Sequence, residues 1–503
     1  MNTPKLLIGA AVAALLAGPA LADKASNSVH LAFTKELETA DTYFNTAREG
    51  VLLSYQVWDA LLYRDPKTNQ YVGNLAVEWS WVDDKTMEFK LRQGVTFHNG
   101  EAFTADDVVY TFNFLVDPKN GVKNTANSAW IDHAEKVDDY TVRLHMKAPF
   151  PAAEEYLAGP LVIYPDEYYA KVGPSGMNAE PVGTGPYKVV KNETGKHLSL
   201  LRNDAYFDGP KGKPTVEKID IRTIPDVNTQ IAEFFNGTLD FIFNVPADQT
   251  EKLAALDRYK VVNGASMRIG YLTLDAAGRS DPNGPMTKKE VRQAMWHAID
   301  RQAIVDALVK GASQVINSAC APSQANCAQD VPSYDYDPAK AKELLKQAGY
   351  PDGFTIEFAA YRDRPYAEAM MGYLEAVGIK PKLSYMQYAA LREKRRKGEV
   401  PVTFTTWGSN SVADASASTG EYFTGGPEDD ARDPQVIADI KQADGTIDKA
   451  ARAALYKKAL TRIAEEAYWI PLFTYNVNYV MSPDLNFEPT PDEVIRFYEL
   501  TWN

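Results

Sequence analysis

The alternation of two patterns along the chain most constrains its fold: short strand-like runs alternate with helical segments throughout. In one clear example, Asp337 can cap a helix, a proline occupies the first helical position, and Gly349 ends the segment. The apolar run FTIEFAAY follows almost at once. This alternation predicts an α/β fold. Because 503 residues are many for one hydrophobic core, we expect two or three lobes.

The first 22 residues, MNTPKLLIGAAVAALLAGPALA, are typical of a cleaved secretory signal peptide. Lys5 precedes an uncharged apolar run, and small residues end the segment at Ala22. A membrane anchor is the alternative, but the run is shorter than the about 20 residues that span a bilayer. We therefore expect cleavage after Ala22 and a periplasmic protein. The residue directly after the cleavage site is Asp23 and not a cysteine, so no lipid anchor is expected.

The charge and motif content disfavours several classes of function. The chain has 67 acidic and 53 basic residues, which disfavours nucleic acid and anionic lipid as partners. The six histidines are scattered without an HExxH motif, and neither a phosphate-binding loop nor a nucleophile elbow is present. We therefore expect no catalytic residues, no metal site and no cofactor.

Cys320 and Cys327 lie in the stretch SACAPSQANCAQD. In an oxidising compartment, two cysteines that close so short a loop indicate a disulfide, with a gain of about 2 to 3 kcal/mol. A metal site is the alternative, but no histidine lies nearby and zinc prefers four ligands. The acidic loop from Thr424 to Pro434 is expected to be exposed and mobile.

Trp407 ends an apolar, β-branched run and precedes a small polar segment in PVTFTTWGSNSVADAS. An aromatic side chain at the end of a strand, beside a polar loop, suits the wall of a cleft that binds a polar small molecule. The structural alternative is an indole that only plugs the end of the strand.

Four stretches resemble the large solute-binding proteins of ABC importers, the family 5 (cluster C) proteins that include dipeptide-, oligopeptide- and nickel-binding members. They are the stretch from 75 to 112, which resembles the signature region, and the stretches 181–189, 289–313 and 336–354. The resemblance implies a class II periplasmic-binding-protein fold with two α/β lobes and an extra domain inserted into the first. It implies lobe I at 23–66, 187–267 and 476–503, the inserted lobe at 67–186, and lobe II at 268–475.

The resemblance also implies how such a chain works. A ligand is buried between lobes I and II, and the closed form is recognised by the permease subunits of an ABC transporter. We expect a monomer, and a membrane chemoreceptor is a further possible partner. The alternatives from other classes are a secreted hydrolase and a carrier of a metal chelate.

The resemblance places several residues at the ligand site. Peptide-binding members use a Trp-x-x-Asp stretch to hold the peptide's ammonium, and the matching stretch here runs from Trp407 to Asn410. An RPY stretch in dipeptide binders holds the ligand carboxylate, and here it gives Arg364. Surface ion pairs are the structural alternative for the arginines. The other candidates are Arg268, Tyr271, Tyr361, Phe33, Thr34 and Glu36.

Asn410 departs from the peptide-binding pattern. A buried ammonium needs a counter-charge, which an amide does not supply, although Asp414 or Glu36 would be a substitute. We therefore hypothesise a carboxylate-bearing or hydroxylated ligand, such as a non-standard peptide, an opine or a sugar-type solute. An ordinary dipeptide or oligopeptide is the alternative.

Overall fold

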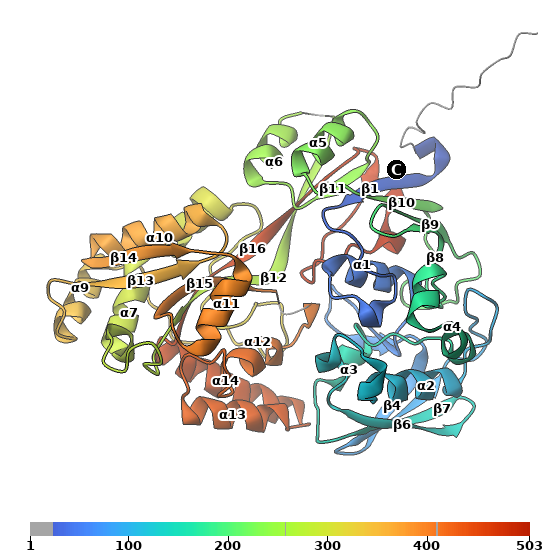
Figure 1. Ribbon diagram of the computed structural model, residues 1–503, viewed down its shortest axis with the longest axis horizontal. Helices are drawn as coiled ribbons and strands as arrows, with labels where there is room; N and C mark the ends of the chain where they lie inside the picture. Colours follow the sequence, from blue (N-terminus) through green and yellow to red (C-terminus); the bar gives the residue numbers. More distant parts are fainter. Residues whose placement is uncertain (1–23, 257, 409–410) are drawn as a thin grey trace, which may run out of the picture.

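The computed structural model describes residues 24–256, 258–408 and 411–503. The expected signal peptide and Asn410 lie outside these residues. Within them the fold is α/β with mixed sheets, as the sequence predicts, and two lobes are joined by two long strands (Figure 1).

The main sheet of the described residues has ten strands and runs through both lobes. It contains both parallel and antiparallel pairs, because helices separate some strands and hairpins join others. In sheet order the strands are β14 (Ile379–Tyr385), β13 (Phe354–Ala360), β15 (Val402–Trp407), β12 (Lys260–Leu274), β16 (Trp469–Met481), β11 (Phe241–Phe243), β1 (Ser28–Phe33), β10 (Lys218–Thr223), β9 (His197–Arg202) and β8 (Tyr187–Glu193).

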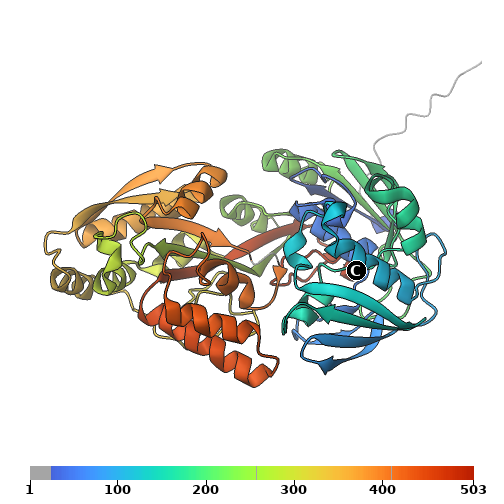
Figure 2. The ribbon, with the colours of Figure 1, turned by 60° about the horizontal axis from the view of Figure 1, so that its bottom comes forward.

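The strands β12 and β16 cross between the lobes side by side (Figure 2). They pair antiparallel, and their register shifts between Ala265 and Ile269. Such a β-bulge bends a strand and changes the direction of nearby side chains. A second register shift follows between Gly270 and Tyr271, so the paired backbone of the two strands is irregular over this short stretch between the two lobes.

Two large apolar cores lie on either side of these strands. One cluster draws its buried side chains from residues 29–243 and 477–500, and the other from residues 267–475. We call the parts around them the first and the second lobe. The lobe boundaries inferred from the resemblance remain a proposal.

The first lobe includes a four-stranded antiparallel sheet in the order β4 (Ala76–Asp83), β5 (Thr86–Leu91), β7 (Thr141–Met146), β6 (Ile131–Asp138). A capping box begins α2, because Thr104 accepts from the amide of Asp106 and Asp107 accepts from that of Thr104. Further elements of this lobe are β2 (Leu62–Arg64), β3 (Tyr71–Gly73), β17 (Leu485–Asn486), β18 (Thr501–Trp502), α1 (Arg48–Val57), α2 (Ala105–Val116), α3 (Ala153–Leu157), α4 (Asp166–Ala179), α5 (Val227–Phe235) and α6 (Ala247–Ala254).

The second lobe confirms the predicted helix that ends near Gly349. Asp337 accepts a hydrogen bond from the amide of Lys340, and Gly349 takes the positive φ of 87° that closes the helix. The helices of this lobe are α7 (Lys289–Ala298), α8 (Arg301–Ile304), α9 (Pro338–Gln347), α10 (Arg364–Ala376), α11 (Tyr388–Lys397), α12 (Ser416–Tyr422), α13 (Pro434–Asp444) and α14 (Lys449–Glu465).

The acidic loop at 424–434 is not exposed as expected. Glu428, Asp429 and Asp430 are 6%, 1% and 8% exposed. Glu428 and Asp430 pair with Arg395, which lies on α11 and is itself 5% exposed. The expectation was wrong because these carboxylates form ion pairs with an arginine on a helix about 30 residues earlier in the chain.

None of the helices in the described part of the chain combines the length and the apolar composition that crossing a membrane requires.

Candidate ligand-binding site

A cavity of about 600 Å³ lies between the two lobes. Its size is within the range of small-molecule sites, about 300 to 1,000 Å³. The first lobe contributes side chains around the start of α1 and from residues 115–161. The second lobe contributes Arg268, Tyr361, Tyr388, Thr406, Trp407, Gly408, Ser411 and Val412.

The start of α1 forms one wall of the cavity. Ala47 is its N-cap and makes no side-chain capping hydrogen bond, and Arg48 follows at the first helical position. The Arg48 guanidinium donates to the carbonyl of Asp492, with Nη2 at 2.7 Å from the oxygen, and to the hydroxyl of Ser411. A cation at a helix N-terminus opposes the helix dipole, so Arg48 is not placed there for helix stability.

The end of β15 forms the opposite wall. Trp407 lies edge-on to Tyr422, at 5.6 Å between ring centroids, and its indole N–H has no partner among the described residues. The Tyr361 hydroxyl lies 3.0 Å from the Thr406 hydroxyl, and the Tyr361 ring is 4.9 Å from that of Tyr388. Tyr388 is 47% exposed, so an aromatic face remains open at this wall.

Arg268 lies against the backbone beside Trp407. A Cβ atom at Gly408 would stand 2.6 Å from Arg268 Nη2, so a side chain at position 408 would displace the guanidinium. Arg268 Nε is 4.0 Å from Glu493 Oε1, at the limit of an ion pair, and both side chains are partly exposed. Glycine at 408 thus allows Arg268 to take its place on the cavity wall.

The described cavity lining carries two cationic and two acidic side chains, but one of the acids is neutralised by an arginine outside the lining. It carries Arg48 and Arg268, and its only acidic side chains are Glu155 and Glu493. Glu155 is already paired with Arg64, at 3.2 Å from Nε to Oε2. Among the described residues, no carboxylate lies within 4.0 Å of the Arg48 guanidinium. The charges therefore favour a ligand with an anionic group.

Three of the residues that the sequence suggests come together at the cavity: Trp407, Arg268 and Tyr361. Asn410 lies outside the described residues. Glu36 is exposed near Gly195, and neither it nor its neighbour Thr34 lines the cavity.

The remaining suggested residues have structural roles away from the cavity. Tyr271 is fully buried and stacks on Trp469, with 3.7 Å between ring centroids. Phe33 is 2% exposed and belongs to the core of the first lobe. Asp414 is 4% exposed, and Arg452 holds it through both oxygens.

Arg364 lies on the surface and forms an ion pair there, which was the structural alternative to a ligand contact. It begins α10, and its Nε lies 2.7 Å from Glu368 Oε1, one helical turn later. Its side chain is 60% exposed, so this pair contributes little to stability. A ligand contact is therefore not proposed for Arg364.

Sequence reasoning missed Arg48 and Tyr388. Arg48 carried a signal, because a cation at the first position of a helix breaks the usual charge preference, and broken local rules mark functional positions. Tyr388 carried none: it begins α11, three residues after the end of β14, and no neighbouring motif distinguishes it from the other tyrosines.

Asp41 fixes the part of the first lobe from which Thr42 and Tyr43 line the cavity. It is fully buried, and it accepts hydrogen bonds from the amide of Tyr43 and the hydroxyls of Tyr164 and Tyr169. Burial raises the pKa of Asp41 to about 6, although these hydrogen bonds lower it. The protonated form is thus favoured by folding.

This raised pKa predicts a pH dependence. Stability from a raised carboxyl pKa is complete below the unfolded pKa of about 3.9 and is lost as pH rises through about 6. Relative to the wild type, Asp41→Asn should gain about 3 kcal/mol in free energy of unfolding between about pH 3.5 and pH 7. Urea unfolding at both pH values measures this difference. A difference that stays constant across the range would contradict the raised pKa.

The sequence is similar to those of known solute-binding proteins. Residues 70–430 match the family described as bacterial extracellular solute-binding proteins, family 5 Middle. Heme-binding protein A of Haemophilus influenzae is 27% identical over 478 residues, which cover 88% of this chain and 85% of that protein. The glutathione-binding protein GsiB of Salmonella paratyphi A is 30% identical over 521 residues, 98% of each chain.

A solved structure agrees in fold. HbpA2 from Haemophilus parasuis superposes with a TM-score of 0.83 at 24% identity, covering 95% of this chain and 100% of that one. The shared fold is the two-lobed α/β fold of periplasmic binding proteins with an extra domain.

Proposed function

The chain belongs to the family 5 bacterial extracellular solute-binding proteins, and from that premise we propose that it captures a carboxylate-bearing, hydroxylated solute between its lobes. It would deliver this solute to the permease subunits of an ABC importer, from the periplasm. Binding proteins of this kind act through a shift between open and closed populations rather than through chemistry. The observation that carries the ligand class is the pair of cavity arginines, Arg48 and Arg268, against one loosely paired acid, Glu493.

The rest of the lining supports hydroxyl or ring groups elsewhere on the ligand. Tyr361, Tyr388 and Trp407 offer aromatic surface at one wall. The hydroxyls of Ser54 and Thr46 and the indole N–H of Trp407 offer hydrogen-bonding groups. Non-standard peptides, opines and sugar acids combine such groups with a carboxylate, and glutathione, named in one relative, is a peptide with two carboxylates.

An ordinary peptide is the second candidate, because Glu493 lines the cavity and is 4.0 Å from its cation. A peptide ammonium at Glu493 would compete with Arg268 for the same carboxylate. Asp414 supports this candidate less, because Arg452 already neutralises it.

Two experiments test the proposed function together. Native mass spectrometry of gently purified protein should reveal a co-purified small anionic solute. A thermal-shift panel should then rank sugar acids and opine-type conjugates first, ahead of glutathione and of dipeptides to pentapeptides, all of which carry a free ammonium. Ligand at about 1,000 times its Kd adds roughly 4 kcal/mol, so the shift is easily measured. Preferential stabilisation by ordinary peptides would contradict the ligand class.

Asn410 provides a sharper test of the same point. Asn410→Asp adds the acid that peptide-binding members carry, so it should strengthen binding of free-amino peptides and weaken binding of carboxylate ligands. Repulsion or attraction by one added charge at a partly desolvated site is about 1 to 3 kcal/mol, roughly five- to 150-fold in Kd. Isothermal titration calorimetry of both proteins measures it. Equal changes for both ligand classes would remove Asn410 from the site.

A further inference from the structure

A short segment of the second lobe, residues 411–415, contacts the first lobe at the rim of the cavity. We propose that this segment is a clasp that holds the lobes together over the ligand, with Ser411 and Glu155 as its positioning residues. The inference rests on the proposed function, because the clasp acts by closing the cavity that this function assigns to the ligand.

The first contact of the clasp joins Ala413 to Glu155. The amide of Ala413 donates to Glu155 Oε1 at 2.6 Å, across the boundary between the lobes. Glu155 is 5% exposed, and its Oε2 accepts from the Tyr71 hydroxyl at 2.8 Å and faces Arg64 Nε at 3.2 Å. A hydrogen bond to a buried, ionised acceptor is stronger than one between neutral groups. Tyr71 and Arg64 thus hold the Glu155 carboxylate in place on the first lobe, with Oε1 directed at the Ala413 amide.

The second contact joins Ser411 to the wall of the cavity. Its hydroxyl donates to the carbonyl of Asp492 at 3.0 Å and accepts from the Arg48 guanidinium. Ser411 has a φ of 64°, a left-handed conformation that is unfavourable for a residue with a side chain. The surrounding contacts hold it there. Because Arg48 also lines the cavity, the clasp is connected to the cation proposed to bind the ligand.

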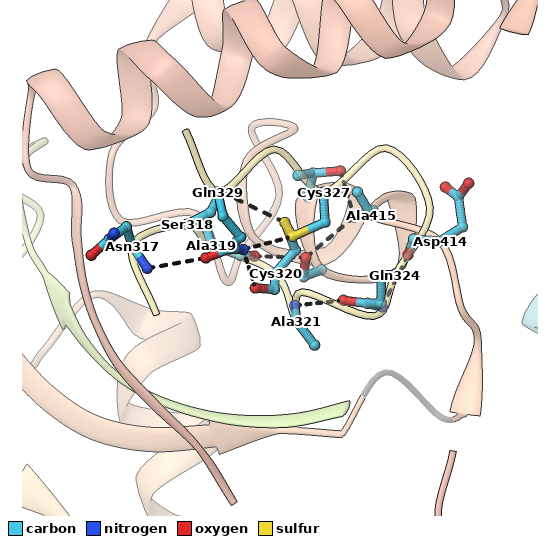
Figure 3. The surroundings of a disulfide bond; sticks show 12 residues. Asn317, Ser318, Ala319, Cys320, Ala321, Gln324, Cys327, Gln329, Asp414 and Ala415 are labelled. Atoms are coloured by element: carbon cyan, nitrogen blue, oxygen red, sulfur yellow. Dashed lines mark hydrogen bonds between the residues drawn. A yellow bond between two sulfur atoms is a disulfide. The ribbon is translucent and has the colours of Figure 1, made fainter. Parts of the chain in front are cut away.

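The disulfide loop braces the clasp from the second lobe (Figure 3). Cys320 and Cys327 are joined, as the sequence suggests, and close a loop that contains Ala325. The amide of Ala325 donates to the carbonyl of Ala413 at 2.8 Å, and the amide of Ala415 donates to the carbonyl of Ala325 at 2.9 Å. Loop and clasp therefore run side by side as a short parallel bridge.

Two side chains complete this brace. Gln324 Nε2 donates to the carbonyls of Val412 and Asp414, at 2.9 and 3.1 Å. The Asp414 carboxylate binds Arg452 at 2.7 and 2.8 Å and accepts from Asn326 at 2.9 Å. The clasp is thus fixed to its own lobe by backbone, amide and ionic contacts. A segment that is already ordered loses little conformational entropy when it contacts the other lobe. Most of the free energy of its hydrogen bonds therefore contributes to closure.

The clasp predicts how opening responds to mutation. A net contribution of about 0.5 to 1.5 kcal/mol per hydrogen bond corresponds to roughly a two- to tenfold change in the ratio of closed to open protein. Ser411→Ala removes the hydroxyl that donates to the Asp492 carbonyl and accepts from the Arg48 guanidinium. It should therefore shift the ratio of closed to open protein about tenfold toward the open form. Glu155→Gln keeps an acceptor for the Ala413 amide but loses the charge, so it should open the protein less than Glu155→Ala does.

The experiment is residue-level hydrogen exchange of the Ala413 amide in protein without added ligand. We expect slow exchange in the wild type, about tenfold faster exchange in Ser411→Ala and Glu155→Ala, and an intermediate rate in Glu155→Gln. Ser333→Ala, a change at an exposed serine of the same lobe, should match the wild type. Small-angle scattering should give a larger radius of gyration for the faster-exchanging variants.

Unprotected exchange of Ala413 in the wild type would overturn the clasp. So would wild-type exchange in Ser411→Ala, which is the variant that keeps the buried charges intact and is expected to fold. The Cys320→Ser/Cys327→Ser double variant should also speed exchange if the loop is a brace. Because these measurements need no ligand, a failed ligand panel would contradict the proposed function and leave this result unaffected.

Discussion

Replacing Asp492 with alanine should lower the free energy of unfolding by about 3 to 5 kcal/mol. Asp492 is 3% exposed and holds two buried arginines at once. Its Oδ2 lies 2.6 Å from Arg496 Nη2 and 3.0 Å from Arg64 Nη2. Without the carboxylate, Arg64 retains Glu155 at 3.2 Å, whereas buried Arg496 retains only Glu499 at 4.0 Å. Urea unfolding followed by circular dichroism measures the loss.

The pKa of Asp492 supports this expectation and fixes its pH range. Burial by itself would raise this pKa, but Arg496 and Arg64 hold it well below the usual value. Stability from a depressed carboxyl pKa is present above the unfolded value of about 3.9 and is lost only as pH falls below it. The effect of the substitution should therefore be complete at neutral pH. Asp484→Ala, at an exposed position, should change stability by less than about 0.5 kcal/mol.

A loss below about 1 kcal/mol for Asp492→Ala would contradict this account. It would mean that the two arginines find other counter-charges, of which Glu155 and Glu499 are the nearest to them. The double variant Asp492→Ala/Arg496→Met would then be no more stable than the single one. If the account is correct, the double variant should recover part of the loss, because it removes one of the uncompensated charges.

The second large effect concerns ligand affinity. Arg268→Ala and Arg48→Ala should each weaken binding of the ligand identified by native mass spectrometry by about 2 to 3 kcal/mol, roughly 30- to 150-fold in Kd. The reason is that lobe closure removes the ligand's anionic group from water and leaves it without its cation. Isothermal titration calorimetry measures the change, and most of it should appear as faster dissociation.

Arg364 provides the matched control for these variants. It is an arginine of the second lobe, but its side chain is 60% exposed and pairs with Glu368 outside the cavity. Arg364→Ala should leave Kd within about twofold of the wild type. Arg268→Lys should be intermediate, because lysine keeps the charge but not the planar pair of donors. If Arg364→Ala weakened binding more than Arg268→Ala, the proposed position of the anionic group would be wrong.

The sequence predicted those parts of the fold that depend on neighbours along the chain. The helix from Pro338 to Gln347 was predicted because its capping aspartate, first-turn proline and closing glycine are local signals. The α/β class followed from the same kind of alternation. The cysteine pair at 320 and 327 is close in sequence, so its disulfide could also be anticipated.

Features that depend on distant partners could not be predicted in this way. Asp414 was a candidate for a ligand ammonium, but its charge is taken by Arg452, which lies 38 residues later. Tyr271 was placed beside the cleft, but its ring stacks on Trp469 from the neighbouring strand. The sequence pattern indicates where a strand lies and where it ends. The register between paired strands determines which face of the sheet a side chain occupies, and that register depends on residues far away in the chain.

The bulge in β12 has a mechanical consequence for the closing motion. The strand is about 50 Å long, and on both sides of the bulge its backbone is fully paired with β16. Bending therefore costs least where the register shifts, at Ala265–Ile269 and again at Gly270–Tyr271, and Arg268 lies within the first interval. The Arg268 guanidinium is therefore attached to the part of β12 that bends most easily. If Arg268 binds the ligand as proposed, the direction of its guanidinium would depend on the angle between the lobes, and ligand binding would be coupled to the degree of closure.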